Sequence, residues 1–269
     1  MTPPTSCEPT SFEPTSFEPT FFDPTSFAQE SAAMSRWREA VDHGARGWYS
    51  AARAAARELH HAADPVVRSL SWSLEGSLER QLGGHAAASV CDGVALADSG
   101  FGRVRLDPRR TDAAVDALVG LAADSIGSRR LSRSGVLLRR AEAVLAGREG
   151  HARVALRVLW VRAEVNMARG DAETALAAAE AAVDTSYAVA SERHRIKSRV
   201  ILSAAHLVAG ERIAAAAEAQ SARSDAEALD LLPLAWAAAS ISEALGETGA
   251  KLARESHEVA IRTRGGRFS

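Results

Sequence analysis

Small residues recur along most of the chain at spacings typical of paired α-helices. In the stretch 160–184 they are separated by seven, five and seven residues: Ala163, Gly170, Ala175 and Ala182. Residues seven apart lie on one face of a helix, two turns from each other, and a glycine after that face ends the helix without strain. The pattern therefore predicts two antiparallel helices joined at Gly170, with Asp171 capping the second.

The same spacing returns several times. Two further copies are Gly76, Gly83, Ala88, Ala95 and Ser203, Gly210, Ala215, Ala222; looser ones are Ala40, Gly47, Ala52, Leu59, then Ala122, Arg129, Ser134, Ala141, and Ala239, Gly246 with Ala253 and Ala260. Helices approach to about 8–10 Å only where small side chains meet. Each hairpin leaves apolar faces bare, so neighbouring hairpins must stack to cover them. We expect an all-α array of about six stacked antiparallel hairpins over residues 34–265.

Proline placement agrees with this reading. The body holds only Pro65, Pro108 and Pro233, each where a helix should begin, and in the first case Asp64 can cap the helix that Pro65 opens. Ala, Leu, Arg and Glu, all strong helix formers, dominate the body, and we find no strand-like alternation bounded by turn residues.

The N-terminal stretch differs from the body. Six of the nine prolines and five of the seven phenylalanines precede residue 28, in a repeating five-residue unit. A proline every five residues prevents a helix and interrupts a sheet ladder, so residues 1–33 are predicted to be a disordered tail. Its phenylalanines could alternatively serve as short anchors for a partner.

The repeated pattern resembles the tetratricopeptide repeat, best at Trp72, Gly76, Gly83, Ala88 and Ala95. The resemblance implies a right-handed superhelix of helix hairpins. Successive turn positions are 36, 46, 41, 40 and 36 residues apart, longer than the family repeat of about 34, and the closing proline of the family motif is mostly missing. The longer units resemble, more weakly, the repeat regions of large bacterial transcriptional regulators.

The resemblance also implies a concave groove, lined by the first helix of each hairpin, that holds a segment of a partner protein. The groove residues carried over are Trp37, Arg80, Arg157, Trp160, Glu164, Met167 and Lys197. Residues 157, 160, 164 and 167 are spaced as one helical stripe. Trp160 and Met167 could equally be packed core. A carboxylate clamp of the chaperone-binding kind is not expected, because Asp116 stands where that clamp needs a base.

Candidate chemistry is sparse. We find no phosphate loop, no HExxH and no GxSxG motif, and the two cysteines and eight histidines are scattered. No cofactor or metal is therefore expected. A body near neutrality does not favour nucleic acid, and no apolar run approaches the roughly 18 residues of a membrane span. With no secretion signal, we expect a cytoplasmic protein. The basic stretch around Lys197 reads as a solvated face, or less simply as an anion site.

Three functions remain open on the sequence. We expect a non-enzymatic scaffold or regulator that binds a peptide segment of a partner. A sensor of a small ligand or peptide would share the fold and have a narrower cavity. An enzyme built from scattered residues, such as His194, Glu164 and Arg157, is the third, and the absence of a nucleophile–base constellation argues against it.

Overall fold

The computed structural model describes residues 24–268, with side chains from residue 32 onward, and these residues form twelve α-helices. The helices are α1 (Pro24–Ala45), α2 (Tyr49–Leu59), α3 (Pro65–Gln81), α4 (His85–Asp98), α5 (Pro108–Gly127), α6 (Leu131–Leu145), α7 (Ala152–Arg169), α8 (Ala172–Ser186), α9 (Glu192–Ala209), α10 (Arg212–Ala228), α11 (Leu232–Ala244) and α12 (Ala250–Thr263). The predicted all-α class is confirmed.

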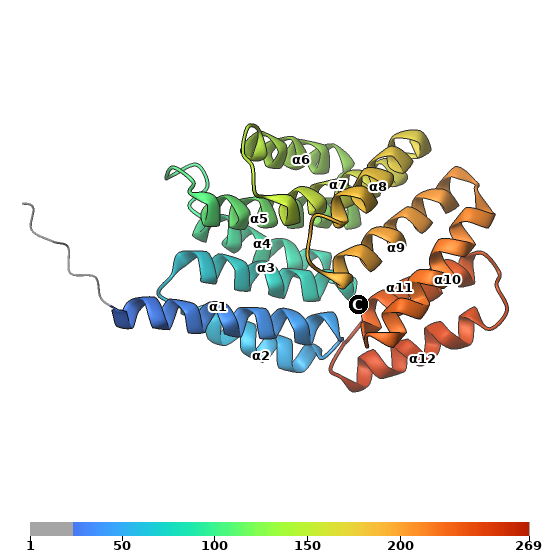
Figure 1. Cartoon of the computed structure of the whole chain (residues 1–269), viewed down its shortest axis with the longest axis horizontal. Helices are drawn as coiled ribbons and strands as arrows, with labels where there is room; N and C mark the ends of the chain where they lie inside the picture. The colour runs from blue at the N-terminus through green and yellow to red at the C-terminus, as the bar shows by residue number, and fades with distance from the viewer. Residues whose placement is uncertain (1–23, 269) are drawn as a thin grey trace, which may run out of the picture.

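Consecutive helices pack in pairs, which gives six hairpins stacked in chain order (Figure 1). The odd-numbered helices also contact one another from α1 to α11. Each even-numbered helix instead contacts chiefly the helices directly before and after it. The first helix of each hairpin therefore belongs to an inner row, and the second covers it from outside.

The small residues lie at the helix crossings and turns that their spacing predicts. Ala163, Ala175 and Ala182 are fully buried, and Gly170 adopts a left-handed conformation with φ 77° between them. The turn residues of the other five hairpins also have positive φ, including Arg129 at 58°. Small side chains thus mark the helix crossings, and the turn between each pair of crossings needs a left-handed residue.

The helix starts agree with the sequence as well. The Asp64 carboxylate accepts a hydrogen bond from the Val66 N–H at 2.8 Å, with Pro65 in the first turn. Asp171 caps α8 by accepting from the Thr174 N–H at 3.1 Å. These carboxylates satisfy N–H groups that the first turn of a helix leaves without partners.

The first helix reaches into the stretch predicted to be the tail. Helix α1 begins at Pro24, upstream of the predicted boundary at residue 34. A proline in the first turn is compatible with a helix because its missing N–H has no partner there anyway. The predicted tail residues 1–23 lie outside the described part of the chain.

The last hairpin returns to the first. Beyond α12, the Arg264 carbonyl accepts a hydrogen bond from the Ser50 N–H at 3.2 Å, and the Gly265 carbonyl accepts one from Arg53 at 3.2 Å. The Arg264 guanidinium donates to the carbonyl of Arg46 at 2.6 Å. Residues 264–268, which we call the closing segment, therefore join the end of the array to the α1–α2 hairpin.

Packing supports this junction. Arg264 also makes two hydrogen bonds of 3.0 Å to Asp230 and lies over the Trp48 ring at 4.4 Å. Tyr49 and Ile261, from opposite ends of the chain, are buried in one cluster. At Gly266 an added Cβ would lie 3.1 Å from the Tyr49 ring and would overlap Ile261. The closing segment thus fits tightly and joins the two ends of the array into a ring around the concave face.

We predict that Arg129→Gly raises the melting temperature, by an amount corresponding to up to about 1 kcal/mol, because glycine adopts positive φ without steric cost. Arg130→Gly is the matched control, since Arg130 has φ −98°. Thermal denaturation monitored by circular dichroism measures both. No gain in Arg129→Gly over the control would contradict the strain assigned to this turn.

We predict that Arg264→Ala destabilises the fold by about 1–3 kcal/mol, because it removes a bidentate charged pair and a hydrogen bond to a carbonyl. The control is Arg36→Ala, which loses only an ion pair to Glu58 whose two side chains are both 67% exposed, worth about 0–1 kcal/mol. Urea denaturation compares the two. Equal losses would show that the junction contributes little.

Candidate functional site

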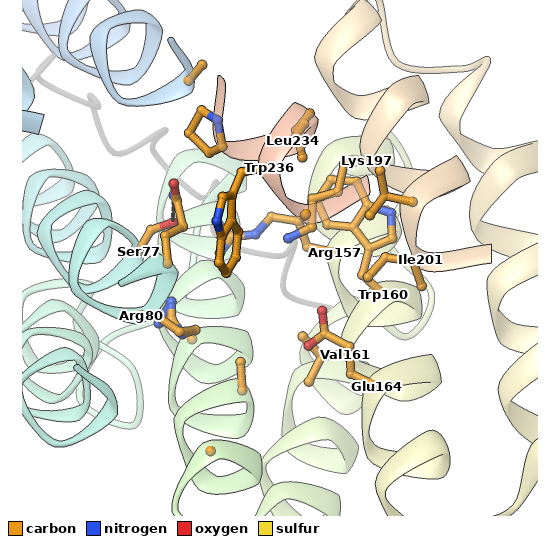
Figure 2. Close-up of a pocket in the computed structure, with 18 of the residues that line it drawn as sticks. Ser77, Arg80, Arg157, Trp160, Val161, Glu164, Lys197, Ile201, Leu234 and Trp236 are labelled. Atoms are coloured by element: carbon orange, nitrogen blue, oxygen red, sulfur yellow. Dashed lines mark hydrogen bonds between the residues drawn. The ribbon is translucent and has the colours of Figure 1, made fainter. Parts of the chain in front are cut away.

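A central cavity of about 480 Å³ lies inside the ring (Figure 2). Every helix of the inner row contributes to its wall, together with α2, α4, α12 and Phe268 of the closing segment. Apolar side chains form much of the lining: Val119, Ala123, Ile126, Val161, Val200, Ile201, Leu234, Ala237 and Ile261. A second cavity of about 110 Å³ shares part of this wall and extends toward Trp37 on α1.

Helix α7 supplies Arg157, which borders both cavities. Its guanidinium is bonded to Asp116 on α5, and Arg153 holds the same carboxylate at 2.8 and 3.1 Å. Burial alone would raise the pKa of Asp116, but Arg153 and Arg157 together hold it below its ordinary value. The carboxylate is therefore ionised, and it offsets positive charge behind the cavity wall.

Helix α9 supplies two more cations, Arg193 and Lys197, which border both cavities. The Lys197 ammonium lies 4.6 Å from the centre of the Trp160 ring. Burial lowers the pKa of Lys197 to about 8, against an opposing effect of Glu164. Burial, with Arg157 and Arg153 nearby, lowers the pKa of Arg193 to about 10. Among the side chains of residues 32–268, no carboxylate forms an ion pair with either cation, although the charge of Asp42 on α1 also acts on Arg193.

His194 is a further neighbour of Trp160. The two rings stack at 5.5 Å, and the His194 Nδ1 is 2.8 Å from the Ser191 hydroxyl. Burial, followed by the charges of Arg193 and its neighbours, lowers the pKa of His194 to about 3. The imidazole is thus neutral near pH 7. It borders the smaller cavity, whereas Glu164 borders the larger one.

Opposite these cations, α3 places Arg80 in a buried network. Its guanidinium bonds Asp124 at 2.9 Å and also contacts Asp92. Burial raises the pKa of Asp92 to about 7, with Arg80 opposing and Asp124 adding to the rise. Glycines make room for this carboxylate: a Cβ at Gly120 would overlap Asp92, and one at Gly76 would lie 3.0 Å from it. Arg80 is thus balanced from behind by two acids.

Trp236 on α11 forms another part of the wall (Figure 2). Phe268 of the closing segment packs against it at 5.2 Å between ring centroids. The Trp236 Nε1 is buried and has no hydrogen-bond partner among the described residues. A buried donor without a partner is costly, so this N–H is an unsatisfied polar group behind the cavity wall.

The structure brings most of the predicted groove residues together. Five of them line the central cavity: Arg80, Arg157, Trp160, Glu164 and Lys197. Trp37 lines the smaller cavity, and its indole N–H donates to the Leu70 carbonyl at 3.1 Å. Met167 lies apart from both cavities, packed against the cluster that contains Ala163 and Ala175. Trp160 is both core and cavity wall. It is buried, its Nε1 donates a hydrogen bond to the Ser198 hydroxyl at 2.9 Å, and it lines the central cavity.

Two residues at the site, Arg193 and Trp236, were not predicted. Arg193 precedes Lys197 by four residues, so the same helical periodicity could have found it. Trp236 had no such signal, because it reaches the cavity only through closure of the ring. The basic stretch around Lys197 is not one solvated face. Arg199 forms ion pairs with Glu218 and Asp225 of α10, while Lys197 borders the central cavity.

No protein-family model matches this chain, and no curated protein matches it. Among the described helices, none is long and apolar enough to cross a membrane. The described residues also contain no group of three His, Cys, Asp or Glu side chains placed to hold a metal ion.

We predict that Asp92→Asn changes how stability depends on pH. The pKa of Asp92 in the fold, about 7, exceeds its ordinary value of 3.8, so the native state holds the proton more tightly than the unfolded chain. This contribution is complete below about pH 4 and is lost as the pH rises toward 7. The melting temperature of Asp92→Asn should therefore rise relative to wild type between pH 4.5 and 7.5.

The matched control is Asp98→Asn, at the end of the same helix. Melting temperatures of the three proteins, measured across this pH range, give the comparison. A difference between Asp92→Asn and wild type that stays constant with pH would contradict the raised pKa of the buried carboxyl group.

Proposed function

We propose that this protein is a non-catalytic ligand-binding module of tetratricopeptide-like hairpins that holds a small molecule in its central cavity. This proposal rests on one observation: the two ends of the array join, and the ring surrounds a cavity of about 480 Å³ whose wall is largely apolar. Sites for small molecules have volumes of about 300–1,000 Å³ and combine apolar walls with a few polar groups. This cavity has that size and that mixture.

Ring closure favours the ligand-sensing alternative over an open groove for an extended peptide. The closing segment occupies the end of the concave face, where Phe268 packs on Trp236. An enzyme gains no comparable support: His194 and Glu164 border different cavities, and His194 is neutral near pH 7. An acid and a base acting on one substrate should converge on a common point.

The cavity wall also suggests how an occupant could be sensed. Ala45 and Tyr49 come from the first hairpin, and Ile261 and Phe268 come from the end of the chain. A ligand that contacts both ends binds the closed ring better than an opened one, so it stabilises closure by mass action. A partner protein that distinguishes closed from open rings would then respond to the ligand.

The test uses the neutral fluorophore N-phenylnaphthylamine with the full-length protein. We expect saturable binding of one probe molecule per chain, with increased emission as the probe leaves water. Ala237→Phe, which narrows the cavity, should reduce probe affinity by roughly tenfold or more, since tenfold corresponds to about 1.4 kcal/mol. Val136→Phe is the control, because Val136 is 41% exposed on α6, away from the cavity.

Thermal denaturation accompanies the titrations, so that loss of binding is read only for variants that remain folded. Non-saturable probe binding to the wild type would refute the proposed function. So would equal probe affinity in folded Ala237→Phe and in the Val136→Phe control.

A further inference from the structure

Two cations of α9 face the cavity in an arrangement that is unfavourable when the cavity holds no anion. Arg193 and Lys197 are four residues apart, so they lie on the same face of the helix, and like charges at this spacing repel. Both are partly buried and both border the two cavities. Burial of a cation without a counter-ion adds a desolvation cost to this repulsion.

Other cations around the cavity are already balanced by protein carboxylates. Arg157 and Arg153 share Asp116, and Arg153 also lies 3.6 Å from Asp112. Arg80 contacts both Asp92 and Asp124. These pairs leave Arg193 and Lys197 against a single carboxylate of the wall, Glu164. The charge of Asp42 also acts on Arg193, but Asp42 is already paired with Arg46 at 3.0 Å. The α9 part of the wall therefore carries an excess of about one positive charge, which one monoanionic group would neutralise.

We infer that the cavity binds a small apolar carboxylic acid as its monoanion, with the carboxylate held by Arg193 and Lys197 and the apolar body in the central chamber. This inference rests on the proposed function and adds the chemical class of the ligand. A guanidinium matches a carboxylate in shape and can bond both of its oxygens, and an ammonium adds a point charge beside it.

The remaining wall suits the body of such a molecule. Val200 and Ile201 continue the same face of α9 away from the two cations. Leu234 and Ala237 of α11 and Val161 of α7 complete an apolar chamber, which Figure 2 shows in part. The lining is thus charged in one region and apolar in the rest.

The test is displacement of bound N-phenylnaphthylamine from the full-length protein by a matched pair of competitors, naphthylacetate and naphthylacetamide. They differ in charge and share their apolar body. We expect the acid to displace the probe at roughly tenfold lower concentration than the amide, because a hydrogen bond to a charged group contributes about 1.5–3 kcal/mol.

Two variants test whether the α9 cations cause the preference for the acid. Lys197→Met and Arg193→Gln should each reduce the preference for the acid over the amide severalfold, with the probe affinity of each variant measured first so that the two displacement curves are compared on the same protein. Lys251→Met is the matched control, because Lys251 is the other lysine of the chain and is exposed on α12. It should leave the preference unchanged.

The outcomes separate the two proposals. Loss of saturable probe binding by the wild type would refute the proposed function itself. Saturable probe binding with equal displacement by acid and amide would refute only the carboxylate assignment. Stronger displacement by the dianionic naphthyl phosphate than by naphthylacetate would overturn the monoanion assignment. A preference for the acid that persists in both α9 variants would refute the two cations as its origin.

Discussion

The junction between the closing segment and the first hairpin determines what the rest of the structure can do. Stacked hairpins bury their faces against neighbours, so an open array leaves its terminal hairpins half covered. Here Arg264 and Gly265 bond the α1–α2 hairpin, and Tyr49 and Ile261 share a buried cluster. The two exposed ends cover each other, and the inner row of helices surrounds a space instead of lining an open surface.

The charges around that space are paired mostly between neighbouring helices of the stack. Asp116 offsets Arg153 and Arg157, and Asp92 and Asp124 offset Arg80. Because these pairs are partly or fully buried, removing one partner costs more than the pair contributes. Arg193 and Lys197 lack such partners within the described residues, which sets their part of the wall apart.

The sequence predicts the hairpins better than it predicts the ring. Spacing alone located buried residues such as Ala175 and left-handed turns such as Gly170, because helix crossings require small side chains at fixed intervals. The same helical periodicity grouped Arg157, Trp160 and Glu164 on one face. Local periodicity could not place Trp236, whose position depends on contacts between distant ends of the chain. It also does not separate Met167, which packs against the cluster of Ala163 and Ala175, from the members of its stripe that line the cavity.

Closure also restricts how this architecture can vary. An open solenoid can gain or lose a repeat at little cost, because each unit interacts only with its neighbours. In this molecule Gly266 fits against Tyr49 and Ile261 with no room for a side chain. Adding or deleting one hairpin would move these surfaces apart or force them together. The number of units is therefore fixed by the circumference, and lineages carrying this ring should diverge by residue replacement inside the cavity rather than by duplication of repeats.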